Sequence, residues 1–328
     1  MKSDLSSESL QHTARAFSRS RVLLTAVELD LFTLLAEGPL GIEEVVDRLG
    51  SDTRGTTILL DALAAMGLLV KETGRYTTNP DVAGFLTPGS EDTILPGLLH
   101  SAHLWKTWSR LTEVILGGGP ATRSPTDGED RTKAFIGAMH VRAMRDAPSL
   151  ITAISPGSAR NLIDVGGGSG SYTIGFLNAV PQMRATLFDL PDVIPMARER
   201  FMAAGLMDRV TLVPGDYNTD VLPGGQDLAL LSAVIHQNSH QQNVRLYKKV
   251  CDALEPGGRI IVRDYAMSSD RTRPASGALF AVNMLVNTTG GNSYTFDEIK
   301  AGLEEAGFAK VNLLQEREMS SLVEGWKP

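Results

Sequence analysis

The second half of the chain alternates short apolar runs with stretches whose apolar residues recur at helical spacing. The runs that predict strands are residues 161–165, 184–188, 209–213, 227–232 and 258–263, then 309–315 and 319–324 after a helix at 295–306. Strands that alternate with helices are typical of a parallel sheet with helices on both faces. The pattern therefore predicts a seven-stranded α/β domain over residues 156–328.

The first part of the chain has a different pattern. Apolar residues recur at helical spacing over residues 22–35, and shorter helices are predicted at 41–50 and 53–67. Residues 68–77 read as two short strands around a glycine turn. Helices followed by a hairpin form a winged helix, which we place within residues 1–95.

A winged helix can bind DNA, dimerise or simply pack against another domain. The helix at 53–67, which would contact the bases, has Arg54 as its only basic residue. A DNA-binding face needs several Lys or Arg side chains to neutralise phosphates. The net charge of −7 also means that the chain as a whole does not attract the negatively charged nucleic-acid backbone. We therefore predict a packing or dimerisation role and no nucleic-acid partner.

Length and composition set the broader class. A chain of 328 residues exceeds what a single core usually fills. Residues 96–155, which include a long predicted helix at 131–154, are therefore interpreted as a connector between two domains. Cys251 is the only cysteine, residues 1–10 lack the apolar core of a signal peptide, and no apolar run reaches the ~20 residues of a membrane helix. These features predict a cytoplasmic enzyme without membrane insertion.

A glycine-rich segment follows the first strand of the predicted α/β domain. Glycines let the backbone approach a ligand closely, and the start of the next helix presents free N–H groups to it. A dinucleotide fingerprint needs glycine at the sixth position of G-x-G-x-x-G, but that position is Ser171. The spacing is instead G-x-G-x-G after an aspartate, which looks like the first motif of S-adenosylmethionine (SAM)-dependent methyltransferases. The predicted cofactor residues in this segment are Asp164, Gly166, Gly168 and Gly170.

Further candidates lie where the next strands end. Ligands of open α/β sheets bind outside the carboxyl ends of the strands. Asp189 ends the second strand, where a carboxylate can accept two hydrogen bonds from a ribose diol, and Leu190 follows it. After the third strand, Asp216 can accept from the adenine amino group and Tyr217 can stack on the ring. Ser232, at the end of the fourth strand, is also predicted to bind the cofactor.

These motifs occur in the order seen in a known family. The segments that carry the resemblance are Asp164-Val-Gly-Gly-Gly-Ser-Gly170, Phe188-Asp-Leu-Pro191, Gly215-Asp216 and Leu254-Glu-Pro-Gly-Gly-Arg-Ile-Ile-Val262. The chain resembles the plant-type O-methyltransferase family, which includes caffeic acid and acetylserotonin O-methyltransferases and bacterial antibiotic-tailoring enzymes. The resemblance implies a class I methyltransferase with a Rossmann-like sheet, SAM as cofactor, S-adenosylhomocysteine as product, and a homodimer formed through the N-terminal winged helix.

In that family the catalytic base is the histidine of a His-Asp-Trp motif after the fourth strand. His236 occupies this position, but Gln237 and Asn238 replace the aspartate and the tryptophan. Ser239 and Gln242 form a capping box for the following helix, which places His236 in the loop at the ligand-binding edge of the sheet. A histidine is largely neutral at cytoplasmic pH and can remove the proton of an acceptor hydroxyl.

The family also flanks its catalytic histidine with two acidic residues. Asp264, after the fifth strand, matches the first of them. The second would stand in a Gly-Gly-x-Glu motif, where this chain has Ser293 in Gly290-Gly-Asn-Ser293. Fewer carboxylates stabilise an imidazolium less. The resemblance thus implies His236 as base and Asp264 as its one orienting partner.

The resemblance also implies which residues contact the acceptor. By position these are Met139, His140, Asn283, Met284 and Thr288. Trp105 and Trp108 are candidates for another wall of the pocket. No His, Cys or carboxylate spacing suits a metal, so no metal is expected.

The predicted reaction is methyl transfer from SAM to a hydroxyl of a small aromatic or quinone-like acceptor. The altered His-Asp-Trp motif leaves two alternatives open. One is a methyltransferase of the same fold that acts on carbon or another atom. The other is a SAM-binding regulator without catalysis.

Overall fold

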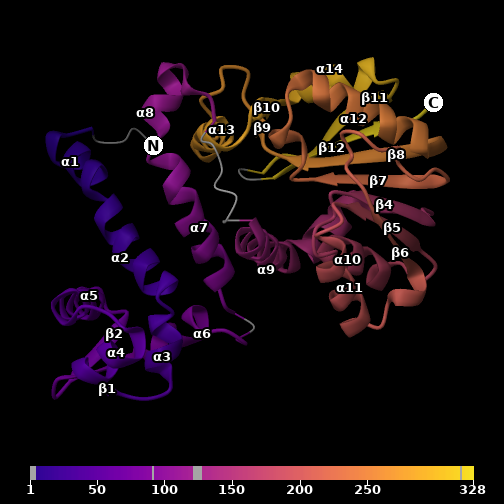
Figure 1. The fold of residues 1–328 in the computed structure, drawn as a ribbon. Helices are drawn as coiled ribbons and strands as arrows, with labels where there is room; N and C mark the ends of the chain where they lie inside the picture. Colours follow the sequence, from indigo (N-terminus) through magenta and orange to yellow (C-terminus); the bar gives the residue numbers. More distant parts are fainter. Residues whose placement is uncertain (1–4, 91, 121–127, 318–319) are drawn as a thin grey trace. The chain divides into compact units, whose positions relative to one another are not determined.

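The computed structural model describes residues 5–90, 92–120, 128–317 and 320–328. The chain forms two compact units (Figure 1). The first consists of Met1–Trp105 and Lys133–Ala138. The second consists of Lys106–Thr132 and Met139–Pro328. In the described ranges, each helix is too short or too polar to span a bilayer.

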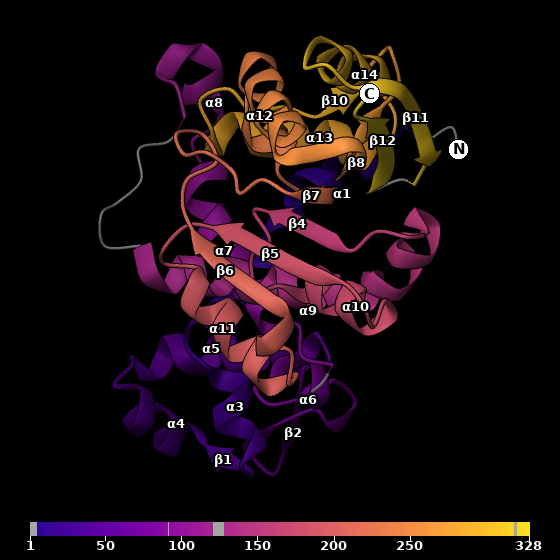
Figure 2. The ribbon, with the colours of Figure 1, turned by 90° about the vertical axis from the view of Figure 1, so that its right-hand side faces the viewer.

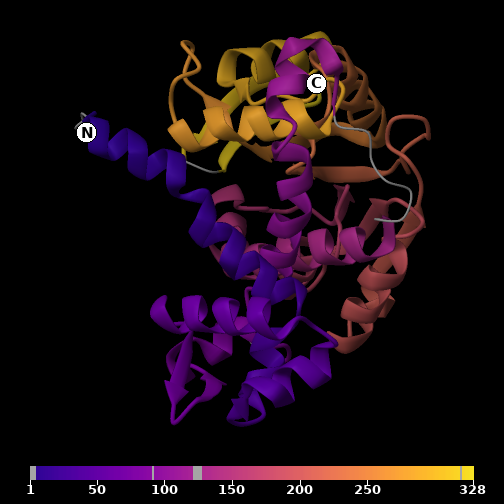
Figure 3. The same ribbon diagram turned by 60° about the vertical axis from the view of Figure 1, so that its left-hand side comes forward.

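The N-terminal unit consists of helices and one small sheet. Its elements are α1 (Ser7–Arg15), α2 (Phe17–Glu28), α3 (Leu31–Ala36), β1 (Leu40–Gly41), α4 (Ile42–Leu49), α5 (Thr53–Ala65), β2 (Leu69–Glu72), β3 (Arg75–Thr78), α6 (Pro80–Leu86) and most of α7 (Leu95–Trp108). The sheet has the antiparallel order β1-β3-β2. Figure 3 shows these elements in indigo and purple, with the hairpin projecting beside the helices. The predicted winged-helix order of helices and hairpin is confirmed.

The single helix predicted at 22–35 is wrong, because the chain breaks between α2 and α3. Asp30, between them, has a left-handed backbone with a φ of 51°, which interrupts the helical hydrogen bonds. The apolar spacing continues across the break because Val27, Leu31 and Leu35 all enter the same buried core. Hydrophobic periodicity alone could not reveal the interruption.

The second unit alternates strands and helices. Its elements are α8 (Leu111–Glu113), the π-helix η1 (Val114–Gly118), α9 (Gly128–Ile154), β4 (Asn161–Val165), α10 (Ser171–Ala179), β5 (Arg184–Asp189), α11 (Ile194–Ala203), the 3-10 helix η3 (Met207–Arg209), β6 (Val210–Pro214), β7 (Gln226–Ser232), the 3-10 helix η4 (Ile235–Gln237), α12 (His240–Ala253), β8 (Leu254–Asp264), β9 (Ala266–Met267), α13 (Ala275–Asn287), β10 (Tyr294–Thr295), α14 (Phe296–Glu305), β11 (Ala309–Gln315) and β12 (Ser321–Trp326).

Seven of these strands form one sheet in the order β11-β12-β8-β7-β4-β5-β6, which confirms the predicted fold class. All neighbouring pairs are parallel except those of β12, which is antiparallel to both β8 and β11. The sheet is visibly twisted in Figure 2, where β4, β5 and β6 follow one another. The strand order reverses between β4 and β7, so the loops after these strands flank the ligand-binding crevice of such sheets.

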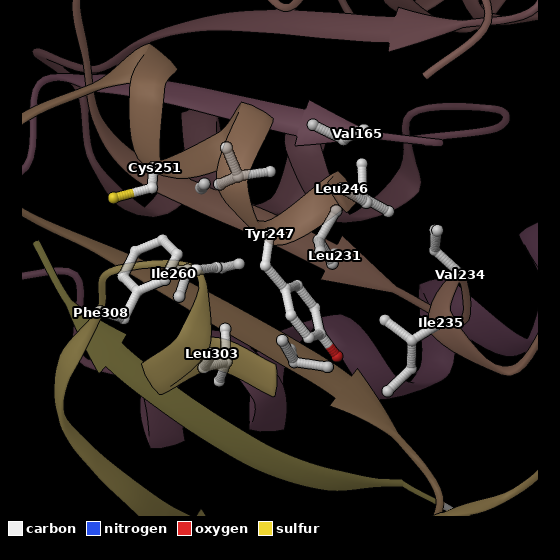
Figure 4. Packing of buried hydrophobic residues seen from close by; sticks show 14 of the residues in the cluster. Val165, Leu231, Val234, Ile235, Leu246, Tyr247, Cys251, Ile260, Leu303 and Phe308 are labelled. Atoms are coloured by element: carbon white, nitrogen blue, oxygen red, sulfur yellow. The ribbon is translucent and has the colours of Figure 1, made fainter. Parts of the chain in front are cut away.

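Helices cover both faces of this sheet. On one face α12 and α14 pack against it, and on the other lie α10 and α11 (Figure 1). Figure 4 shows the first core, in which Tyr247 of α12 lies between Leu231, Ile260 and Leu303. Val234 and Ile235 belong to the same core, at 3% and 1% exposure. They therefore anchor the loop that carries His236.

Some elements differ from the sequence-based expectation. β8 starts at Leu254, four residues earlier than predicted, and the last strand covers Ser321–Trp326 instead of 319–324, residue 319 being outside the described ranges. The short parallel pair of β9 and β10 was not predicted. Two residues per strand carry no periodicity, so only tertiary contact forms this pair.

Asp164 lies near the carboxyl end of β4, and its side chain is buried, with 1% exposure. Its Oδ2 accepts a hydrogen bond of 2.6 Å from Thr173 Oγ1 in α10. Burial raises the pKa of the Asp164 carboxyl from 3.8 to about 7, although the Thr173 bond opposes the rise. Between these two values the folded state holds a proton that the unfolded state has lost, so stability falls as pH rises through this window.

Replacing Asp164 by Asn should remove this pH dependence. Between pH 5 and pH 8 the Asp164 carboxyl should cost the wild type about 2.6 kcal/mol of its free energy of unfolding, a loss that Asp164→Asn should not show in urea unfolding at both pH values. Asp252→Asn, at an exposed position of α12, is the matched control. Parallel pH profiles of wild type and Asp164→Asn would contradict the raised pKa.

Candidate cofactor and catalytic site

The glycine loop after β4 has the backbone that its sequence predicts. Gly166, Gly168 and Gly170 have φ values of 72°, 57° and 79°, in the left-handed region that favours glycine. A Cβ on Gly170 would lie 2.5 Å from a ring carbon of Phe201, so this position also excludes side chains by packing. The loop is thus held close to α11 and the sheet.

Asp189 closes the loop from the neighbouring strand. Its Oδ2 accepts from the Gly168 amide at 2.7 Å and its Oδ1 accepts from the Leu190 amide at 2.7 Å. Burial raises the pKa of the Asp189 carboxyl, and the two amide bonds act against that rise. Each carboxylate oxygen keeps acceptor capacity, so the group fits a pair of ribose hydroxyls.

The loop after β6 places Tyr217 beside the glycine loop. A Cβ on Gly166 would lie 3.9 Å from Cε1 of Tyr217, and burial raises the pKa of the Tyr217 phenol to about 12. Lys249 of α12 donates to the carbonyls of Tyr217 and Asp220 at 2.8 and 2.9 Å. Asp216 accepts from the Asn218 amide with Oδ1. This loop is therefore fixed, with an aromatic face at the predicted nucleoside site.

Ser232 ends β7 on the other side of β4. Arg263 Nη1 donates to its hydroxyl at 3.4 Å, and Arg263 Nη2 donates to Asp146 Oδ2 of α9 at 2.8 Å. The Arg263 guanidinium also lies 5.1 Å from the centre of the Tyr172 ring. A buried cation thus ties the end of β8 to α9 and α10.

His236 and Asp264 form a buried pair at the ends of β7 and β8. Nδ1 of His236 lies 2.9 Å from both carboxylate oxygens of Asp264, and the side chains are at most 10% exposed. Oδ1 of Asp264 also accepts from the Tyr265 amide at 2.8 Å. A carboxylate can only accept, so this contact places a proton on Nδ1, and in the neutral tautomer Nε2 is then the acceptor nitrogen. Nε2 has no hydrogen-bond partner within the described ranges and can receive a proton.

An aromatic stack supports the imidazole. Phe280 of α13 lies edge-to-face with His236 at 4.8 Å between ring centres and stacks on Tyr265 at 4.6 Å. Such pairs contribute about 0.5–1.5 kcal/mol beyond area burial. Phe280 was not predicted, because no local pattern marks which face of α13 meets His236.

Gln237 and Asn238, which replace the family's aspartate and tryptophan, lie in different environments. Gln237 is exposed, whereas Asn238 is buried and donates to Asn243 Oδ1 at 3.1 Å. Asn243 Nδ2 in turn donates to the Ile235 carbonyl at 2.9 Å. The hydroxyl of Tyr294 donates to the Asn238 carbonyl. Asn238 therefore belongs to a buried amide network that holds the His236 loop.

The segment 290–293 lies against the backbone of His236. The Asn292 amide donates to the His236 carbonyl at 2.9 Å, and a Cβ on Gly291 would lie 2.4 Å from that same oxygen. Ser293, at the position of the family's second acidic residue, donates its hydroxyl to the Gly277 carbonyl. This segment fixes the histidine through its backbone and not through a second carboxylate.

The predicted acceptor residues in α13 and at its C-cap lie in two kinds of environment. Asn283 Oδ1 accepts from Trp108 Nε1 at 2.8 Å and from Asn287 Nδ2 at 3.0 Å, and its own amide hydrogens have no partner among the residues that the structure describes. Met284 is buried at 6% exposure. Thr288 donates to the Met284 carbonyl and accepts from the Gly291 amide, which uses its hydroxyl in the turn.

The other candidates come from α9 and α7. Met139 is half-buried. Nδ1 of His140 lies 2.7 Å from Ser171 Oγ and 3.1 Å from Ser169 Oγ, so His140 contacts the glycine loop. Trp105 belongs to the N-terminal unit, where its ring centre is 6.5 Å from that of Phe17.

Comparison with known proteins agrees with this architecture. The family model of the O-methyltransferase domain matches residues 117–309, and that of the O-methyltransferase dimerisation domain matches residues 11–88. The chain is 31% identical to the 3-hydroxy-5-methyl-1-naphthoate 3-O-methyltransferase of Streptomyces sahachiroi, covering 93% of this chain and 90% of the relative. It is 33% identical to the tetracenomycin polyketide synthesis 8-O-methyl transferase TcmO of Streptomyces glaucescens, covering 95% and 94%.

Two further proteins extend the comparison. The N,N-dimethyltransferase OxyT of Streptomyces rimosus is 29% identical over 97% of this chain and 94% of its own. The crystal structure of human N-acetylserotonin methyltransferase in complex with SAM superposes with a TM-score of 0.82 and 25% identity, covering 100% and 99% of the two chains. The predicted family and cofactor are confirmed. The chain belongs to the O-methyltransferase family and is a SAM-dependent methyltransferase.

Proposed function

We propose that the protein transfers the methyl group of SAM to a hydroxyl of a small aromatic or quinone-like acceptor, with His236 as general base. The observation that carries this proposal is the buried pair of His236 and Asp264 at the ligand-binding edge of the sheet. Two O-methyltransferase relatives, one named for a hydroxynaphthoate and one for tetracenomycin polyketide synthesis, support an aromatic or polyketide acceptor.

The cofactor residues proposed lie at the carboxyl ends of four strands, β4, β5, β6 and β7. They are Asp164, Gly166, Gly168, Gly170, Asp189, Leu190, Asp216, Tyr217 and Ser232. Within this set Asp189 would hold the ribose diol and Tyr217 would face the adenine, whereas buried Asp164 would act through Thr173 and the loop backbone. When bound, SAM supplies an electrophilic methyl group on a sulfonium.

The proton balance of the reaction assigns a task to each member of the pair. As the acceptor oxygen bonds to the methyl carbon and the carbon–sulfur bond breaks, the hydroxyl proton passes to Nε2 of His236. Asp264 keeps Nδ1 protonated and stabilises the resulting imidazolium. The Asn292 bond to the His236 carbonyl keeps the ring from shifting as its charge changes. Asn283, Met284, Met139 and Thr288 are proposed to shape the acceptor pocket.

A second candidate is methyl transfer to nitrogen. The relative OxyT is named as an N,N-dimethyltransferase, and removal of a proton from an amine by His236 would follow the same geometry. A screen of phenols, hydroxyquinones and aromatic amines with methyl-labelled SAM distinguishes the two, because mass spectrometry and NMR locate the methylated atom. Label on oxygen supports the proposal, and label on nitrogen or carbon alone contradicts it.

Homodimer formation is proposed for the N-terminal unit. The match to the dimerisation domain supports it, as do the exposed apolar side chains of Leu10 and Phe17, each 59% exposed.

Binding of S-adenosylhomocysteine tests the cofactor site. Excess ligand should raise the melting temperature of the wild type by mass action, whereas NAD should not. Asp189→Asn loses one of two acceptors for the ribose diol and should bind about tenfold more weakly by calorimetry. Asp192→Asn, exposed three residues later, is the control and should bind like the wild type. Equal affinities of Asp189→Asn and wild type would reject the ribose assignment.

Substitution of the base tests the mechanism. On the acceptor with the highest turnover, we expect His236→Ala to lower kcat about 10²–10⁴-fold without changing affinity for S-adenosylhomocysteine. The loss should shrink for acceptors with more acidic hydroxyls, because these need less help to ionise. Asp264→Asn should also lower kcat. His12→Ala, on exposed helix α1, is the control, and full turnover by His236→Ala would remove His236 from the mechanism.

The oligomeric state can be read by sedimentation. The wild type should sediment at twice the chain mass of 35.2 kDa. The double substitution Leu10→Asp with Phe17→Asp should shift it toward the single-chain mass, because charges cannot be buried in an apolar interface. A wild type that stays at the single-chain mass at micromolar concentration would refute the homodimer.

A further inference from the structure

We propose that His140, together with Ser169 and Ser171, recognises the carboxylate at the methionine end of SAM, and that His140 does not contact the acceptor. This inference rests on the proposed function, because it assumes that SAM binds at the glycine loop. It changes the role that family resemblance assigns to His140.

The side chain of His140 reaches the glycine loop itself. Its Nδ1 is 2.7 Å from Ser171 Oγ and 3.1 Å from Ser169 Oγ, and the two hydroxyls are 3.0 Å apart. Both serines are more than nine-tenths buried, at 7% and 3% exposure, whereas His140 is half-buried. Three polar groups from α9, the loop and the start of α10 therefore meet at one point.

The position of this cluster along the loop identifies the part of SAM that it faces. Ser169 directly follows Gly168, whose amide is bonded to Asp189. Asp189 is the proposed ribose ligand, so the residues that follow in the loop stand at the end of SAM away from the adenine. That end carries an α-amino acid group, which needs polar partners.

The charges around the cluster favour a carboxylate there. Arg200 of α11 is close enough to lower the pKa of His140, after the larger effect of burial. Arg263 lies over the ring of Tyr172, the residue after Ser171, and its ion pair with Asp146 neutralises the nearby acidic group of α9. Arg263 is thus already paired, and the positive charge of Arg200 together with the Ser169 hydroxyl favours a negatively charged group at this site.

Neutral His140 completes the site as a donor. If the Ser171 hydroxyl donates to Nδ1, the ring proton lies on Nε2. Nε2 has no hydrogen-bond partner among the residues that the structure describes, so it is free to donate to the carboxylate.

Two ligands that differ only at the methionine end test this assignment. S-adenosylhomocysteine carries the amino-acid group, and 5′-methylthioadenosine lacks it but keeps the nucleoside. By calorimetry, His140→Ala should weaken S-adenosylhomocysteine about tenfold or more and leave 5′-methylthioadenosine within about twofold of the wild type. Ser171→Ala should also weaken binding of S-adenosylhomocysteine. His140→Asn, whose amide can still form hydrogen bonds with the serines, should lose less of this affinity than His140→Ala.

His12→Ala is the matched control and should leave both affinities unchanged. Equal weakening of both ligands by His140→Ala would show a merely structural role and overturn the inference. So would unchanged affinities combined with a raised acceptor KM, which would return His140 to the acceptor pocket. If His140→Ala does not fold, the test uses Ser171→Ala and compares its loss of affinity for S-adenosylhomocysteine with its loss for 5′-methylthioadenosine. A wild type that binds neither ligand would instead refute the proposed function itself.

Discussion

Parallel pairing of β8, β7, β4, β5 and β6 is the constraint on which the site depends. Because neighbouring strands run in the same direction, their carboxyl ends lie at one edge, and every functional loop starts from that edge. Residues far apart in the chain become neighbours in this way, such as His236 after β7 and Asp264 at the end of β8. The apolar cores on both faces hold the strands in register, so the loops inherit a rigid support.

The catalytic half of the site differs from the family pattern in chemistry but keeps a defined geometry. One carboxylate orients the imidazole, and the place of a second acidic residue is taken by Ser293, whose hydroxyl is used elsewhere. Positional control comes instead from the backbone contact of Asn292, the amide network of Asn238 and the ring of Phe280. In the proposed reaction, a single carboxylate would stabilise the His236 imidazolium less than two would, which favours acceptors whose hydroxyl ionises readily.

The cofactor half is built around backbone amides. Asp189 binds two of them and still offers acceptor capacity to a ligand, so the loop is ordered before the cofactor arrives. Such preorganisation lowers the entropy cost of binding. In the proposed site, His140 of α9 and the two loop serines form a second preformed polar cluster, which would bind the methionine end of the cofactor.

The sequence by itself determined the fold class, the glycine loop and the carboxylates at the strand ends, because each depends on local periodicity or on a fixed spacing. The pairing of His236 with Asp264 was implied only by the resemblance to the family. Tertiary structure alone decided the break at Asp30, the β9 and β10 pair and the contact of Phe280 with His236. It also brought His140 to the glycine loop. Apart from the break at Asp30, these features arise between segments distant in the chain, where packing and burial select the partner and no local pattern records it.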